Sequence, residues 1–219
     1  MNIYVVVEGE VGEKRVYQNW VPLVNPDLTY VPHISDIASN NFSIISGGGY
    51  PNYKNVIEAA FKDIDDYSTV DRLVIAADSE ELSYEEKRCE IEDFISNYEF
   101  MVEVRIVIQH FCLETWALGN RAIIRNNPQC PVLAKYKRFY NVINLDPEAL
   151  PAYQEQGLNR AQFAMAYLKR AVNDKYRNLT YNKSKPDVLL HPNYYKRVKD
   201  RYEQTGHLCS FNDFLSAFL

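Results

Sequence analysis

Acidic side chains follow predicted strands at three places in this sequence of 219 residues. Glu8 ends an opening run of β-branched and aromatic residues. Asp78 and Glu80 come directly after a second apolar run, and Glu114 comes shortly after a third. Ligands of an open parallel sheet gather outside the carboxyl ends of its strands, so these acids are expected to approach one another at one edge of the sheet.

The binding of a divalent cation is the chemistry that such a cluster would support. Carboxylates that share a small volume raise one another's pKa, and burial adds to the cost of keeping them charged. Mg²⁺ or Mn²⁺ would offset that cost, because these ions take oxygen ligands and combine carboxylates with substrate phosphate oxygens. We therefore predict that all four acids are metal ligands and catalytic residues of a phosphoryl-transfer site.

A structural role is the alternative for each of these acids. An acid just after a strand can cap the following helix, where a negative charge is stabilising by about 0.3–1 kcal/mol. Glu114 could equally form a salt bridge or cap the short helix that holds Trp116.

Three consecutive glycines form a second candidate site. Gly47, Gly48 and Gly49 lie between a predicted strand and a predicted helix, where free N–H groups and a helix N-terminus could bind phosphate. The segment matches neither a Walker loop nor a dinucleotide-binding fingerprint, and a tight turn explains three glycines equally well.

Basic residues interleaved with aromatic ones form a candidate nucleic-acid-binding surface. Tyr136, Phe139 and Tyr140 alternate with cations in one predicted helix, and a further basic pair occurs in the next helix. The predicted nucleic-acid-binding residues are Lys135, Lys137, Arg138, Lys169 and Arg170, with residues 196, 197 and 199 as further contributors. The alternative is that these side chains belong to ordinary solvated helix faces.

Strands and helices alternate in the first half of the sequence. Apolar runs predict strands over residues 3–7, 28–34, 42–45, 72–77 and 102–108. Helical spacing predicts helices over residues 13–24, 52–67 and 84–98. This alternation predicts an α/β fold, with a mostly parallel sheet flanked by helices on both faces.

Beyond Gly119 the pattern becomes helical and basic. Helices are expected over residues 132–140, 160–175, 192–202 and 211–218. We predict an α/β domain over residues 1–120 and a helical, basic C-terminal extension over residues 121–219 that packs on it.

The net charge of −5 conceals an uneven distribution along the chain. Residues 1–110 contain 8 Lys and Arg against 20 Asp and Glu, whereas residues 111–219 contain 16 against 9. Such a division is typical of a protein in which one part gathers acids and the other binds an anion, although solvated helix faces also produce it.

The sequence has no apolar stretch of the ~20 residues that span a bilayer and no N-terminal signal pattern, so a cytoplasmic protein without membrane contact is expected. Its four cysteines are widely spaced and include no CxxC pair, which favours reduced structural thiols over a zinc site.

Three motifs resemble the Toprim superfamily. The segment Val6-Val7-Glu8-Gly9-Glu10 resembles its opening strand and glutamate. Asp78-Ser79-Glu80 is similar to its paired-acid motif, with Glu in the second place where Asp is usual. Residues 113–119, Leu-Glu-Thr-Trp-Ala-Leu-Gly, resemble a stretch of uncharacterised Toprim-like proteins near the RloB and OLD-nuclease branch, as do residues 144–150 and 209–215 more loosely.

This resemblance implies a Toprim-like fold and an Mg²⁺-dependent nuclease, of a kind that often serves in defence against phage and often acts beside a partner ATPase. By position, Glu8 would ligate a metal or act as general acid or base. Asp78 and Glu80 would ligate magnesium, and Glu114 would support a second ion or the base. Two alternatives stay open: a non-catalytic regulatory module that binds a partner ATPase or a phage protein, and a protein that binds nucleotide without hydrolysing it.

Overall fold

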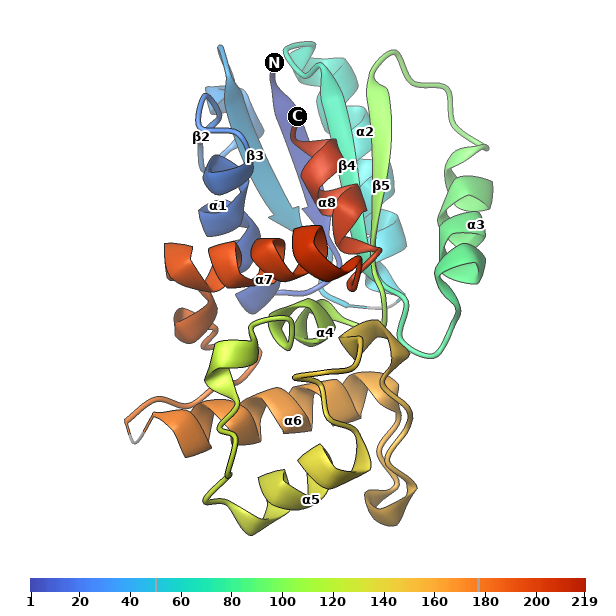
Figure 1. Cartoon of the computed structure of the whole chain (residues 1–219). Coiled ribbons are helices and arrows are strands. Elements are labelled where there is room, and N and C mark those ends of the chain that lie inside the picture. Colours follow the sequence, from blue (N-terminus) through green and yellow to red (C-terminus); the bar gives the residue numbers. More distant parts are fainter. Residues whose placement is uncertain (50, 177) are drawn as a thin grey trace. The chain divides into compact units, whose positions relative to one another are not determined.

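Five strands form one sheet in the order β2-β3-β1-β4-β5 in the computed structural model of the chain, which describes residues 1–49, 51–176 and 178–219 (Figure 1). The strands are β1 (Ile3–Val7), β2 (Thr29–Tyr30), β3 (Asn41–Ser46), β4 (Arg72–Asp78) and β5 (Glu103–Gln109). The central strand β1 pairs in parallel with β3 on one side and with β4 on the other. The predicted α/β class, with a parallel sheet flanked by helices, is confirmed.

The chain divides into two compact units, each built from segments that are separate in the sequence. Unit 1 contains Met1–Ala77, Tyr84–Ile108 and Asp213–Leu219, and unit 2 contains Asp78–Ser83 and Gln109–Asn212. The predicted boundary near residue 120 therefore falls inside unit 2.

Helices cover both faces of the sheet in unit 1. They are α1 (Gly12–Val24), α2 (Asn52–Tyr67), α3 (Tyr84–Ile95) and the greater part of α8 (Phe211–Ala217). Helices α1 and α8 lie on one face of the sheet and α2 on the other (Figure 1). All five residues of β1 are buried, as expected for a central strand with apolar neighbours on both sides.

The last seven residues belong to the core of unit 1. The Phe214 ring lies 5.1 Å from that of Tyr17 and 6.2 Å from that of Trp20, both in edge-on contact. The Arg72 guanidinium donates through Nη1 to the carbonyl oxygens of Ala217 (2.7 Å) and Leu219 (3.0 Å). These contacts fix the end of the chain against β4.

Two predicted elements are shorter than expected. The predicted strand over residues 28–34 is reduced to the two residues of β2, and a 3₁₀ turn, η1 (Ile34–Asp36), follows it. The Val31 N–H makes the last of the bonds to β3, to the Phe42 carbonyl (2.9 Å), and the chain then leaves the sheet. Helix α3 ends at Ile95 rather than near residue 98, where Ser96 and Asn97 are weak helix formers.

Unit 2 is mainly helical, as predicted for the second half of the chain. It contains α4 (Leu113–Ala117), α5 (Pro131–Phe139), α6 (Arg160–Lys175) and α7 (Pro192–Thr205), joined by short 3₁₀ turns such as η2 (Arg121–Ile123). Asn159 and Gln162 form a capping box at the start of α6. The buried Phe163 of this helix stacks on Tyr153 at 4.9 Å and meets Tyr136 edge-on at 5.0 Å.

No helix in the described part of the chain is long and apolar enough to cross a membrane. All four cysteines are free thiols, but only Cys112 is fully buried, and Cys89 and Cys209 are exposed. The expectation of structural thiols therefore fits Cys112 best.

Candidate functional site

The end of β4 is held in place by backbone contacts with the segment that follows β5. The Ser79 N–H donates to the Gln109 carbonyl (3.1 Å) and the Glu80 N–H to the Phe111 carbonyl (2.9 Å). The Ser79 hydroxyl accepts from the Phe111 N–H (2.9 Å) and lies 3.0 Å from Nδ1 of His110. This pairing fixes Asp78, the last residue of β4, relative to the start of α4.

Glu114, in the first turn of α4, is a buried carboxylate that is only half satisfied. Its side chain is 1% exposed. Its Oε1 accepts a hydrogen bond of 2.7 Å from the Tyr181 hydroxyl, whereas Oε2 is buried and has no hydrogen-bond partner among the described residues. A buried carboxylate oxygen without a strong donor is costly, which makes this atom a candidate ligand for a cation.

The charges of Asp78 and Glu114 both act on the buried thiol of Cys112. Burial raises the pKa of this thiol well above its usual value, the negative charges of Glu114 and Asp78 and a hydrogen bond with Glu114 raise it further, and Lys183 partly offsets them. Lys183 Nζ lies 3.9 Å from Asp78 Oδ2 on a largely exposed side chain. We refer to Asp78, Cys112, Glu114, Tyr181 and Lys183 as the Asp78–Glu114 site.

The other two predicted ligands have different surroundings. Glu80 is exposed and has a left-handed backbone with φ of 50°. Glu8 is buried in unit 1, where its N–H donates to the Ala76 carbonyl (3.0 Å). Across residues 1–49, 51–176 and 178–219, no three His, Cys, Asp or Glu side chains form a group that could hold a metal ion. The roles of Glu8 and Glu80 as ligands therefore stay predictions.

The two carboxylates of the Asp78–Glu114 site fit a hard cation that takes few ligands from the protein. Mg²⁺ is commonly bound by one or two carboxylates and completes its shell with water and substrate phosphate oxygens. The buried Oε2 of Glu114 is an oxygen donor of the required kind.

The glycine loop has a structural explanation in the described residues. The Gly47 N–H donates to the Val7 carbonyl (2.7 Å) and the Gly49 N–H to the Glu8 carbonyl (2.9 Å), so two of the three amides are already bonded. A Cβ on Gly47 would lie 2.6 Å from Cβ of Tyr53, so the close approach of α2 requires glycine here. Phosphate binding by Gly47, Gly48 and Gly49 stays a prediction.

The predicted nucleic-acid-binding residues lie on α5 and α6. Lys135, Arg138, Lys169 and Arg170 are exposed. Lys137 instead donates through Nζ to the carbonyls of Arg125 (3.1 Å) and Asn126 (2.7 Å), and so holds the loop before α5. A surface of exposed cations is therefore present on both helices, and its contact with nucleic acid stays a prediction.

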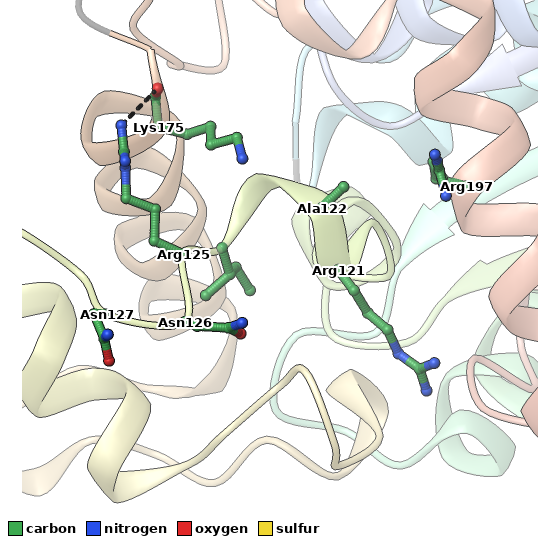
Figure 2. Close-up of a pocket in the computed structure, with 8 residues that line it drawn as sticks. Arg121, Ala122, Arg125, Asn126, Asn127, Lys175 and Arg197 are labelled. Carbon is green, nitrogen blue, oxygen red and sulfur yellow. Dashed lines mark hydrogen bonds between the residues drawn. The ribbon is translucent and has the colours of Figure 1, made fainter.

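Sequence reasoning missed two groups of residues in unit 2. Tyr181 and Lys183 stand in a loop without a motif, and only the fold brings them to Glu114 and Asp78. The second group is Arg121, Arg125 and Lys175, which line a cavity of about 620 Å³ together with Arg197, a residue that the sequence had already singled out (Figure 2). Their separation along the chain leaves no pattern that spacing could reveal.

Comparison with models of protein families, with curated proteins and with solved structures finds no match to this chain. The geometry of its own residues is therefore the basis for a functional proposal.

Proposed function

We propose that this chain is an Mg²⁺-dependent nuclease, or a related phosphoryl-transfer enzyme, that acts on nucleic acid. The observation that carries the proposal is the buried carboxylate of Glu114, which has one oxygen without a hydrogen-bond partner in the described residues and whose charge acts with that of Asp78 on the Cys112 thiol. A carboxylate at the end of β4 and a second in the helix that follows β5 suit a site that receives phosphate oxygens as its remaining ligands.

Asp78 and Glu114 would hold the ion. When bound, Mg²⁺ or Mn²⁺ supplies a water of lowered pKa and stabilises charge on a phosphate in transfer. Tyr181 keeps Glu114 oriented through its 2.7 Å hydrogen bond. Lys183, on an exposed side chain beside Asp78, is placed to contact a phosphate oxygen of the substrate.

Nucleic acid is the proposed substrate because of the charge of the second half of the chain. Residues 111–219 contain 16 Lys and Arg against 9 Asp and Glu. Exposed cations on α5 and α6 suit a phosphodiester backbone, since such contacts supply most sequence-independent affinity for nucleic acid. A role in anti-phage defence beside a partner ATPase is the context that the Toprim resemblance implies.

A non-catalytic regulatory module is the second candidate. Two observations favour it: Glu80 is exposed, and no group of three metal-binding side chains occurs in the part of the chain that the structure describes. Such a module would keep the α/β fold and bind a partner ATPase or a phage protein without hydrolysing a phosphodiester.

The test is cleavage of single- and double-stranded DNA and RNA by the full chain with millimolar Mg²⁺ or Mn²⁺. Asp78→Asn and Glu114→Gln keep the size of each side chain but remove its charge. Each is expected to lower the rate by about 100-fold or more, which is typical for groups that act on the reacting atoms. Glu8→Gln and Glu80→Gln test the two predicted ligands outside this pair.

Glu85→Gln, a charge loss at an exposed position of α3, is the matched control and should cleave at the wild-type rate. Equal rates for wild type, Asp78→Asn and Glu114→Gln would refute the site. Absence of cleavage together with no Mn²⁺ binding by calorimetry would favour the regulatory module.

A further inference from the structure

Four cations from three segments of unit 2 line one cavity. Arg121 and Arg125 come from η2 and the loop after it, Lys175 from the end of α6, and Arg197 from α7. In Figure 2, Lys175 and Arg197 lie on opposite sides of the pocket, with Ala122 between them. We call this cavity of about 620 Å³ the cationic pocket.

The charges of the cationic pocket are largely uncompensated. Within the described residues, only Arg125 has an acidic partner, with its Nε 3.5 Å from Asp174 Oδ2. It is also held by the carbonyls of Asp174 (2.9 Å) and Lys175 (3.4 Å). Arg121 Nε is buried without a hydrogen-bond partner among the same residues.

A fifth cation adjoins the pocket. Arg121 and Arg197 also line a smaller cavity of about 150 Å³ together with Arg201 and one acid, Asp200, which pairs with Lys196 (2.8 Å). Arg201 is 1% exposed, and its guanidinium bonds to the carbonyls of Leu118 (3.3 Å) and Leu145 (2.6 Å) rather than to a carboxylate. Burial lowers the pKa of Arg201 to about 10, and the nearby charge of Arg121 contributes.

Ordinary roles explain each cation separately but not their convergence. Lys175 is at the C-terminus of α6, where a positive charge is favourable, and Arg197 is exposed on α7. Like charges from separate segments repel one another when they share a pocket, so their convergence favours an anionic ligand.

We propose that the cationic pocket binds a phosphorylated ligand through its phosphate groups. Arginine guanidinium groups match phosphate oxygens in a two-pronged geometry, and the Asn126 and Asn127 amides add neutral donors. The described lining has no aromatic side chain on which a base could stack, so the phosphates carry the recognition. Several cations select a ligand with at least two negative charges, such as a diphosphate or successive backbone phosphates.

This inference goes beyond the proposed phosphodiester hydrolysis, because the pocket contains no residue of the Asp78–Glu114 site. It can be tested without divalent metal, and Asp78→Asn should leave it unaffected. Loss of cleavage and loss of phosphate binding are therefore separate results.

The experiment is calorimetric titration of the full chain with pyrophosphate in a metal-free buffer. Lys175→Gln and Arg197→Gln are each expected to weaken binding by about tenfold or more, since a charge-assisted hydrogen bond is lost. Lys62→Gln removes a charge from an exposed side chain of α2, in unit 1, that does not line the pocket, and it should bind like wild type.

A competition arm distinguishes the sources of phosphate. Displacement of a labelled single-stranded oligonucleotide by pyrophosphate, with the same loss in Arg197→Gln, would identify backbone phosphates as the ligand. Pyrophosphate binding without displacement would identify a small phosphorylated molecule. The proposal is overturned by an absence of binding at millimolar pyrophosphate, or by an equal loss of affinity in Lys62→Gln and Arg197→Gln.

Discussion

Glu148 is the residue of unit 2 whose protonation is most clearly coupled to folding. It accepts hydrogen bonds from the Ser210 N–H (3.2 Å) and hydroxyl, and the same hydroxyl accepts from Trp116 Nε1 at 2.8 Å. Burial raises the pKa of Glu148 from 4.5 to about 7, although the bonds from Ser210 oppose the shift. The folded protein therefore binds this proton more tightly than the unfolded chain does.

Stability should fall with pH because of this carboxyl group. Below pH 4.5 Glu148 is protonated in both the folded and the unfolded chain, and it does not reduce the free energy of unfolding. Between about pH 4.5 and 7 the unfolded chain loses the proton first, so the free energy of unfolding falls. The loss reaches its full value above pH 7. Relative to Glu148→Gln, the wild type should lose at most about 3 kcal/mol across that range, since a pKa change of one corresponds to about 1.4 kcal/mol. Urea unfolding of both proteins from pH 4 to 8 measures the difference.

Glu85→Gln controls for the loss of one carboxylate at an exposed position. A constant difference between wild type and Glu148→Gln across the pH range would contradict the prediction.

Residues of the Asp78–Glu114 site could be predicted from the sequence only where they follow a predicted strand. Asp78 and Glu114 were predicted because they follow apolar runs, and the charges of both act on the Cys112 thiol. Tyr181 and Lys183 follow no pattern, since a loop residue contacts whatever the fold brings to it. Glu80 has the right spacing, but its left-handed backbone and its exposure are set by the turn after β4.

At the scale of elements, the close packing of α2 on the glycine loop allows a direct test. An alanine Cβ at Gly47 would lie 2.6 Å from Tyr53 Cβ and 3.1 Å from the Val7 carbonyl oxygen, and neither belongs to a flexible side-chain end. Gly47→Ala is therefore expected to lower the free energy of unfolding by about 2–3 kcal/mol, as overpacking does. Chemical denaturation followed by circular dichroism measures the loss.

Gly49→Ala is the matched control, because no atom lies within 4 Å of a Cβ added there. The substitution is unfavourable only through the positive φ of 83°, which alanine rarely adopts. It should cost about 1 kcal/mol. If Gly47→Ala were the milder of the two, the packing explanation would be wrong.

Regular elements were predictable where apolar periodicity is strong and uninterrupted. The bounds of α2 and α6 agree with the helical spacing at both ends, because each helix buries one continuous apolar face. The strand predicted over residues 28–34 is longer than β2, since the sequence pattern does not reveal where the chain leaves the edge of the sheet. Contacts between elements could not be predicted from the sequence. An example is the pair of hydrogen bonds through which Ser210 joins Trp116 of α4 to Glu148.

At the scale of the whole molecule, the stability of unit 1 depends on residues more than a hundred positions from the rest of it. Phe214 is fully buried and lies edge-on to Tyr17 and Trp20. Phe214→Ala is expected to lower the free energy of unfolding by about 3–5 kcal/mol, as is usual when a buried Phe is truncated. Thermal and urea unfolding of the full chain test this value.

Leu219→Ala is its control, because the Leu219 side chain is 70% exposed and only its backbone carbonyl is bonded. It should change stability by less than about 0.5 kcal/mol. Equal effects of the two substitutions would show that residues 213–219 do not stabilise unit 1.

The division into units could not be predicted from composition. The sequence changes from acidic to basic near residue 110, where the helical region begins. This change does not indicate that residues 78–83 belong to unit 2 or that residues 213–219 belong to unit 1. No linker marks these crossings, because each falls at the end of a strand or within a helix or turn.

The chain changes from one unit to the other four times, which matters for the separate production of either unit. No single stretch of the gene encodes either one. Expression of residues 1–120 would leave Tyr17 and Trp20 without their aromatic cover, and a fragment that starts at residue 121 would lack Glu114 and its helix. Separate production of unit 2 would require residues 78–83 to be joined directly to residue 109, with α3 and β5 removed from between them.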